Sequence, residues 1–160
     1  MATQQIAQQA AGGRRTISGL MAGMIAVAVV GARQVGKTTL VREAFPFAAY
    51  KDLESPLVRL RFAEDAAYEL KQLGDLAILD EAQTVPEVFP ALRGAIDERR
   101  EDRRCHFCVL GSAQPALIRG VSESLAGRVG LLELDPLTPA ETGLPVATHW
   151  LAGGFLDALR

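Results

Sequence analysis

The sequence has few cysteines and no excess of positive charge, and each shortage excludes a class of protein. Cysteine occurs only twice among the 160 residues, too few for a disulfide-stapled secreted scaffold. A reducing cytoplasm is therefore the expected compartment. Lys and Arg number 17 against 19 Asp and Glu, so there is no global basic surface to hold nucleic acid. Nucleic-acid binding is not indicated as the main role.

The chain also has no clear membrane span. The uncharged stretch Thr16–Ala32 follows Arg14 and Arg15 and is short for a span, which needs about 20 apolar residues. With its basic start and small-residue end it resembles a signal peptide. However, Met24–Val30 within it also fits a buried parallel strand, which is a continuous apolar run. We prefer the strand, since cleavage there would destroy the motif that follows.

What is present is an ordinary globular composition, 49% apolar and 22% charged, which fits one domain with a sizeable core. Apolar strand patterns alternate with helical ones, and this order predicts an α/β fold with a parallel sheet covered on both faces. The expected strands are Met24–Val30, Ala48–Leu53, Leu76–Leu79, Phe107–Leu110 and Val129–Leu134. The expected helices are Lys37–Phe45, Leu57–Leu73, Val85–Arg99 and Pro115–Leu125.

A phosphate-binding loop follows the first expected strand. The pattern G-x-x-x-x-G-K-[ST] is filled by Gly31, Gly36, Lys37 and Thr38. Its glycines let the backbone N–H groups curl around phosphate oxygens, Lys37 supplies a point charge, and the Thr38 hydroxyl is a Mg²⁺ ligand. The residues expected to bind nucleotide are Gly31, Ala32, Arg33, Gln34, Val35, Gly36, Lys37, Thr38 and Thr39.

An acidic pair follows the third expected strand. Asp80 ends the run Leu76–Leu79, where a carboxylate can hold Mg²⁺ through water. Glu81 comes next and can polarise the water that attacks a γ-phosphate. The expected ligands are therefore ATP and Mg²⁺. GTP is not favoured, because the chain has no N/T-K-x-D motif and Gln83 stands where a GTPase would have glycine.

Together these residues resemble a family of prokaryotic AAA-type ATPases. The family pattern G-P-R-Q-V-G-K-T-T-L, L-[DE]-x-P, D-E-x-Q, L-T-G-S, S-L-A-G-R and P-L-[ST]-x-x-E is matched in order over about residues 24–155. The matching segments are Gly31–Leu40, Leu53–Pro56, Asp80–Gln83, Val109–Ser112, Ser124–Arg128 and Pro136–Glu141.

The resemblance implies a three-layer αβα core and two further site residues. Ser112 would sense the γ-phosphate, although a helix N-cap is an equally good interpretation of it. Arg128 would stabilise transition-state charge, either in its own chain or across a subunit interface. The alternative for Arg128 is an ordinary surface arginine. Self-association or a protein partner is left open.

The resemblance also predicts a domain organisation. We expect a loosely ordered leader over 1–15, the ATPase core over 16–143, and the start of a C-terminal helical region over 144–160. Family members usually continue into a long C-terminal region, so this chain resembles an ATPase core without it.

Three functions remain as hypotheses. They are Mg²⁺-ATP hydrolysis, a nucleotide-binding switch with negligible turnover, and, less favoured, a fragment of a helicase. The Cys105–Cys108 segment, with His106 inside it, is not expected to bind zinc, since residues three apart on a strand face opposite ways. Cys108 is instead expected to be a buried strand residue.

Overall fold

The computed structural model describes residues 24–99, 101, 104–112, 114–136, 138–142 and 145–148, together with Gly19. Five strands in this part of the chain form one sheet of order β2-β3-β4-β1-β5, with every neighbouring pair parallel. The sheet therefore confirms the predicted fold class. Its strands are β1 (Ala26–Gly31), β2 (Ala49–Asp52), β3 (Ala77–Asp80), β4 (Phe107–Ser112) and β5 (Val129–Leu134).

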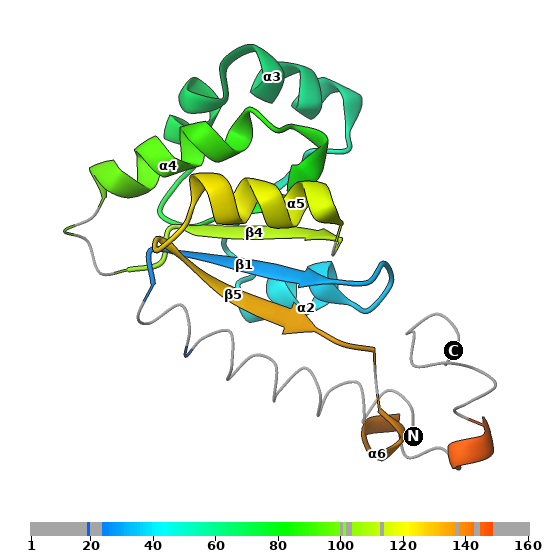
Figure 1. The fold of residues 1–160 in the computed structure, drawn as a ribbon. Coiled ribbons are helices and arrows are strands. Elements are labelled where there is room, and N and C mark those ends of the chain that lie inside the picture. The colour runs from blue at the N-terminus through cyan, green and yellow to red at the C-terminus, as the bar shows by residue number, and fades with distance from the viewer. Residues whose placement is uncertain are drawn as a thin grey trace.

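Helices cover both faces of the sheet and complete three layers (Figure 1). On one face lie α3 (Pro56–Lys71), α4 (Val88–Glu98) and α5 (Pro115–Arg119), and on the other lies α2 (Lys37–Ala44). The structure also has three short elements. They are a 3₁₀ turn η1 (Ala82–Thr84), a π turn η2 (Gly120–Ser124) that continues α5, and α6 (Pro139–Thr142), which follows β5.

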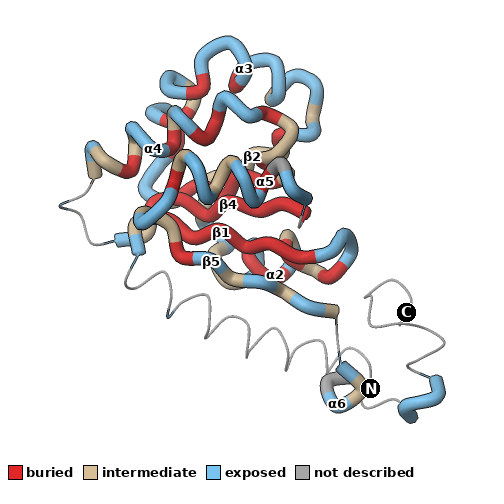
Figure 2. The backbone as a smooth tube through the Cα atoms, viewed as in Figure 1, coloured by how far each residue is buried: buried red, intermediate tan, exposed pale blue. Residues whose placement is uncertain are grey.

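Strand β1 explains the long apolar run of the sequence. All six of its residues are buried (Figure 2). Ala28 and Val30 belong to the core beneath α3, α4 and α5, whereas Val27 and Val29 pack with residues of α2. A strand that faces two cores must be apolar at every position. The structure thus confirms a buried strand here, at Ala26–Gly31 rather than the predicted Met24–Val30.

Two helices differ from their predicted form. Helix α4 begins at Val88 rather than Val85, because η1 comes first. The Thr84 hydroxyl holds that turn by donating to the carbonyls of Leu53 and Glu81, at 2.9 and 2.8 Å. Helix α3 is kinked at Asp65, whose φ and ψ of −152° and 80° are not helical.

Parts of the predicted organisation lie outside the described residues. These are the leader over 1–15 and most of the C-terminal region over 144–160. Among the helices that the structure describes, none has both the length and the apolar character needed to cross a bilayer.

The kink in α3 gives a stability prediction. Asp65 Oδ1 accepts a hydrogen bond from the Tyr68 backbone N–H at 2.9 Å, so it caps the second half of the helix. Asp65→Ala should lower the free energy of unfolding by about 1 kcal/mol in urea titrations. Glu64→Ala, at the neighbouring exposed position, is the matched control and should change it little. Equal losses in both variants would contradict the capping role.

Candidate active site

The carboxyl ends of three strands bring most of the predicted site residues together. Gly31 at the end of β1 lies beside Ser112 at the end of β4, and Asp80 ends β3, the other neighbour of β4. Ligands of open parallel sheets bind at this edge. The phosphate loop, Asp80, Glu81 and Ser112 all lie along it.

The phosphate loop joins β1 to α2 through two left-handed positions. Gln34 has φ of 64° and Gly36 has φ of 92°. Such positions between right-handed ones turn backbone N–H groups toward a common centre. Gly31 is needed for another reason: a Cβ there would collide with the backbone carbonyl of Leu134 on β5. Ala32, Arg33 and Gln34 are exposed, so the loop tip is accessible.

Lys37 begins α2 and is buried, with 6% of its surface exposed. Its ammonium donates to the carbonyls of Gly31 and Ala32, at 3.1 and 2.7 Å. Burial lowers the pKa of this ammonium, and the Glu81 and Asp80 carboxylates oppose that shift. A phosphate oxygen carries charge, so it would be a stronger partner for Lys37 than these two carbonyls.

The Asp80 carboxylate is the most heavily hydrogen-bonded group of the site. The Thr38 hydroxyl donates to its Oδ2 at 2.6 Å, and the Glu81 backbone N–H donates to its Oδ1 at 3.0 Å. The Tyr50 hydroxyl also donates to Oδ2, at 2.8 Å. Because Thr38 gives its proton to Asp80, the lone pairs of its oxygen remain available to a cation. The sequence predicted the meeting of Thr38 and Asp80 but not the part of Tyr50.

Glu81 has an unusual backbone. Its φ and ψ of 52° and 43° place a residue with a side chain in the left-handed region. Such residues are strained and cluster at functional sites. Its carboxylate accepts a short hydrogen bond from the Gln83 amide.

Gln83 joins Glu81 to Ser112. The same amide nitrogen lies 3.3 Å from the Ser112 hydroxyl. Ser112 is buried, and the next helix begins only at Pro115, so its hydroxyl contacts the site rather than capping that helix. Gln83 Oε1 is buried, and among the described residues it has no hydrogen-bond partner. The sequence motif contained Gln83, but nothing in it indicated this bridge.

Arg128 is not brought to the phosphate loop. It precedes Val129, which pairs with Ala26 at the amino end of β1, whereas the loop leaves the carboxyl end at Gly31. Five strand steps, about 16 Å, separate the two ends. The guanidinium instead binds Asp97 through two contacts of 2.8 and 3.2 Å. In this structure Arg128 therefore contacts Asp97 rather than its own phosphate loop, and its catalytic role stays a prediction.

The cysteines lie away from this site. Cys108 is a buried residue of β4, as predicted, and burial raises the pKa of its thiol. Burial also raises the pKa of Cys105, to about 11. His106 Nδ1 lies 2.8 Å from the Asp75 carbonyl oxygen. Among the residues that the structure describes, no three His, Cys, Asp or Glu side chains form a metal-binding group.

The backbone of Glu81 gives a prediction with an unusual sign. Glycine normally destabilises a protein relative to alanine, but in the left-handed region alanine carries the steric cost. Glu81→Gly should therefore be more stable than Glu81→Ala by about 1 kcal/mol in urea unfolding. Both variants remove the carboxylate, so their difference isolates the backbone. If alanine is the more stable, the left-handed conformation is not imposed by the fold.

Comparison with known proteins places these features in a family. A family model described as an AAA domain matches residues 25–143. Two proteins from Mycobacterium bovis and Mycobacterium tuberculosis, both named as uncharacterised, are each 43% identical to the chain over 133 residues. The alignments cover 81% of this chain and 29% of each relative, so the chain spans less than a third of their length.

Two solved structures share the fold of this chain. A Walker-type ATPase of Pyrococcus abyssi superposes with a TM-score of 0.58 at 16% identity, covering 81% of this chain and 54% of that one. The Aeropyrum pernix Orc1 protein, solved in complex with DNA, gives 0.55 at 14%, covering 81% and 46%. At these identities the likeness shows the fold alone. With the match to the family model, it follows that the chain belongs to the AAA-type P-loop ATPases.

Proposed function

We propose that this chain binds ATP with Mg²⁺ and hydrolyses its γ-phosphate. One observation carries the proposal: the 2.6 Å bond between the Thr38 hydroxyl and Asp80 Oδ2, formed where the phosphate loop becomes a helix. This bond places the Thr38 hydroxyl beside the Asp80 carboxylate. A metal ion bound there would have oxygen ligands from both. Family membership supports nucleotide binding, and the roles of individual residues are our assignment.

Residues 31–39 would bind the triphosphate. The backbone N–H groups of the loop and the first turn of α2 attract negative charge. Lys37 would exchange its two carbonyl partners for β- and γ-phosphate oxygens. Arg33 is exposed and lies 3.4 Å from Glu54, a surface ion pair that contributes little and can open.

The donor set beside the loop fits Mg²⁺. This ion takes oxygen ligands, keeps several waters, and is held by one or two carboxylates together with phosphate oxygens. Thr38 would offer its hydroxyl oxygen, and Asp80 would hold a metal-bound water. When bound, the ion would neutralise charge that develops on the phosphates.

Glu81 would activate the attacking water. Its carboxylate would accept the water's proton as the oxygen attacks the γ-phosphorus and the bond to the β-phosphate oxygen breaks. Gln83 already holds this carboxylate and contacts Ser112, so Ser112 could report the γ-phosphate to Glu81 through Gln83.

The same contact supports a second function. A Glu81 carboxylate that Gln83 holds in an orientation out of reach of the attacking water would leave bound ATP intact. A chain that kept this bond after binding ATP would be a nucleotide-dependent switch acting on a protein partner or a second copy. No observation favours the helicase fragment, so we do not propose it. In either remaining function, the cytoplasm would supply the Mg²⁺-ATP.

Hydrolysis and switching are separated by one experiment. We expect the wild type to release phosphate from ATP, measured at steady state, and Glu81→Gln to bind ATP but turn over about 10²–10⁴ times more slowly. Lys37→Ala is the binding control and should lose about 1.5–3 kcal/mol of affinity by calorimetry. Equal turnover of wild type and Glu81→Gln would reject Glu81 as the base. Tight binding without turnover in the wild type would favour the switch.

One catalytic role remains for Arg128, which is to stabilise transition-state charge at the nucleotide bound by a neighbouring copy. Arg128→Ala chains should then be inactive alone and regain turnover when mixed with inactive Lys37→Ala chains, which still carry the arginine. Asp97→Asn is the matched control, because it weakens the same ion pair but keeps the guanidinium, and it should remain active. If both variants lose activity equally and mixing restores nothing, Arg128 has only the structural role of joining β5 to α4.

A further inference from the structure

Tyr50 reaches the centre of the site from an unexpected direction. It lies on β2, at the edge of the sheet, and pairs with Ile78, two residues before Asp80 on β3. Its hydroxyl donates to the same Asp80 oxygen that accepts from Thr38. We propose that Tyr50 is a positioning residue that orients Asp80 for Mg²⁺, an inference that rests on the proposed function.

The two hydroxyls on Oδ2 are not equivalent. Thr38 belongs to the phosphate loop's helix and would have to donate to Asp80 and offer its oxygen to the metal at once. Tyr50 belongs to a strand outside the loop, so its bond to Asp80 does not depend on whether the Thr38 oxygen binds the metal. The Tyr50 phenol donates to Asp80 Oδ2 at 2.8 Å. Tyr50 can therefore hold the carboxylate still while Thr38 engages the ion.

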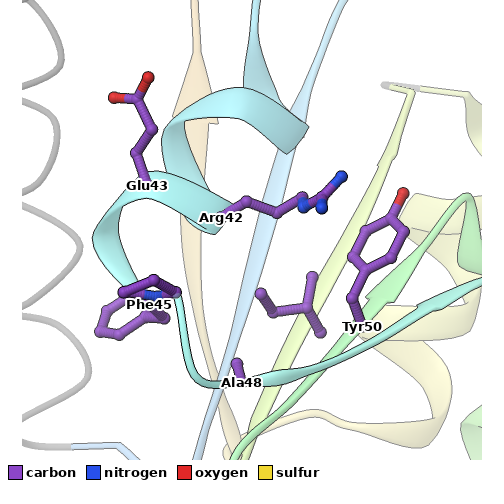
Figure 3. Close-up of a pocket in the computed structure, with 7 residues that line it drawn as sticks. Arg42, Glu43, Phe45, Ala48 and Tyr50 are labelled. Atoms are coloured by element: carbon purple, nitrogen blue, oxygen red, sulfur yellow. The ribbon is translucent and has the colours of Figure 1, made fainter.

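Arg42 in turn holds Tyr50. Its guanidinium lies 4.8 Å from the centre of the Tyr50 ring, reaching across from the last turn of α2. The ring is only half-buried and lines a cavity of about 400 Å³ between the end of α2, β2 and β3. In Figure 3 the Arg42 side chain extends toward Tyr50, whereas Glu43 points away. The ring also packs against the core beneath α2, and Arg42 and the bond to Asp80 are the polar contacts that orient it.

Because of this arrangement, the effect of Tyr50 on metal binding can be measured apart from phosphate binding. Loss of the phenol oxygen leaves Lys37 and the loop backbone unchanged, so nucleotide binding without metal should be preserved. It removes one of the three donors that fix Asp80, so the Mg²⁺-dependent part of binding should weaken. A structural role for Tyr50 would reduce both.

The test compares Tyr50→Phe with Tyr68→Phe, which removes a hydroxyl from an exposed position on α3. Calorimetry would measure ATP affinity in EDTA and across a MgCl₂ series. For Tyr50→Phe, we expect affinity in EDTA within about twofold of wild type, and about a tenfold rise in the Mg²⁺ concentration at half-maximal effect. Tyr68→Phe should match wild type in both. Arg42→Ala should shift the midpoint in the same direction, and Arg42→Lys should restore part of the loss.

Three outcomes would overturn the inference. They are a wild-type Mg²⁺ midpoint in Tyr50→Phe, an equal loss of affinity with and without Mg²⁺, and the same shift in Tyr68→Phe. The proposed function is tested separately, by measuring ATP binding to the wild-type chain. A wild type that binds ATP no better than Lys37→Ala would reject both.

Discussion

Two buried charges must be hydrogen-bonded where they lie, and the carboxyl edge of the sheet is built around this requirement. Asp80 and Lys37 expose only 5% and 6% of their surfaces, and a buried charge without partners is costly. Asp80 meets this need with two hydroxyls and a backbone N–H, and Lys37 with two loop carbonyls. These partners come from β2, from the residue after β3, from the first turn of α2, and from the end of β1 with the residue after it. The same bonds that make the charges tolerable therefore assemble the site.

The sequence predicted the parts of this edge that depend on strand direction. Apolar runs such as Leu76–Leu79 identify buried parallel strands, and the polar residue after each run must then lie at one common edge. That logic located Asp80, whereas the family resemblance pointed to Ser112. The same logic places Arg128 at the opposite edge of the sheet, since it precedes a strand rather than following one. A sequence motif alone does not say on which edge its residues lie.

Tyr50 and Gln83 could not be predicted in the same way. Tyr50 contacts Asp80 only because β2 and β3 pair in the register that sets Tyr50 beside Ile78, and a shift of one residue would turn the side chain to the other face. Gln83 reaches Ser112 only because the chain makes the left-handed turn at Glu81 and then η1. Contacts that depend on register and on one dihedral angle leave no periodic pattern in a sequence.

The unequal layers of the fold suggest where nucleotide would act. Among the described helices, α2 alone covers its face of the sheet, whereas α3, α4 and α5 share the other (Figure 1). Helix α2 begins with Lys37 and Thr38 and carries Arg42 in its last turn, so it would join the phosphates at one end to Tyr50 at the other. Tyr50 in turn contacts Asp80, so α2 links the proposed phosphate site to the carboxylate of the proposed metal site.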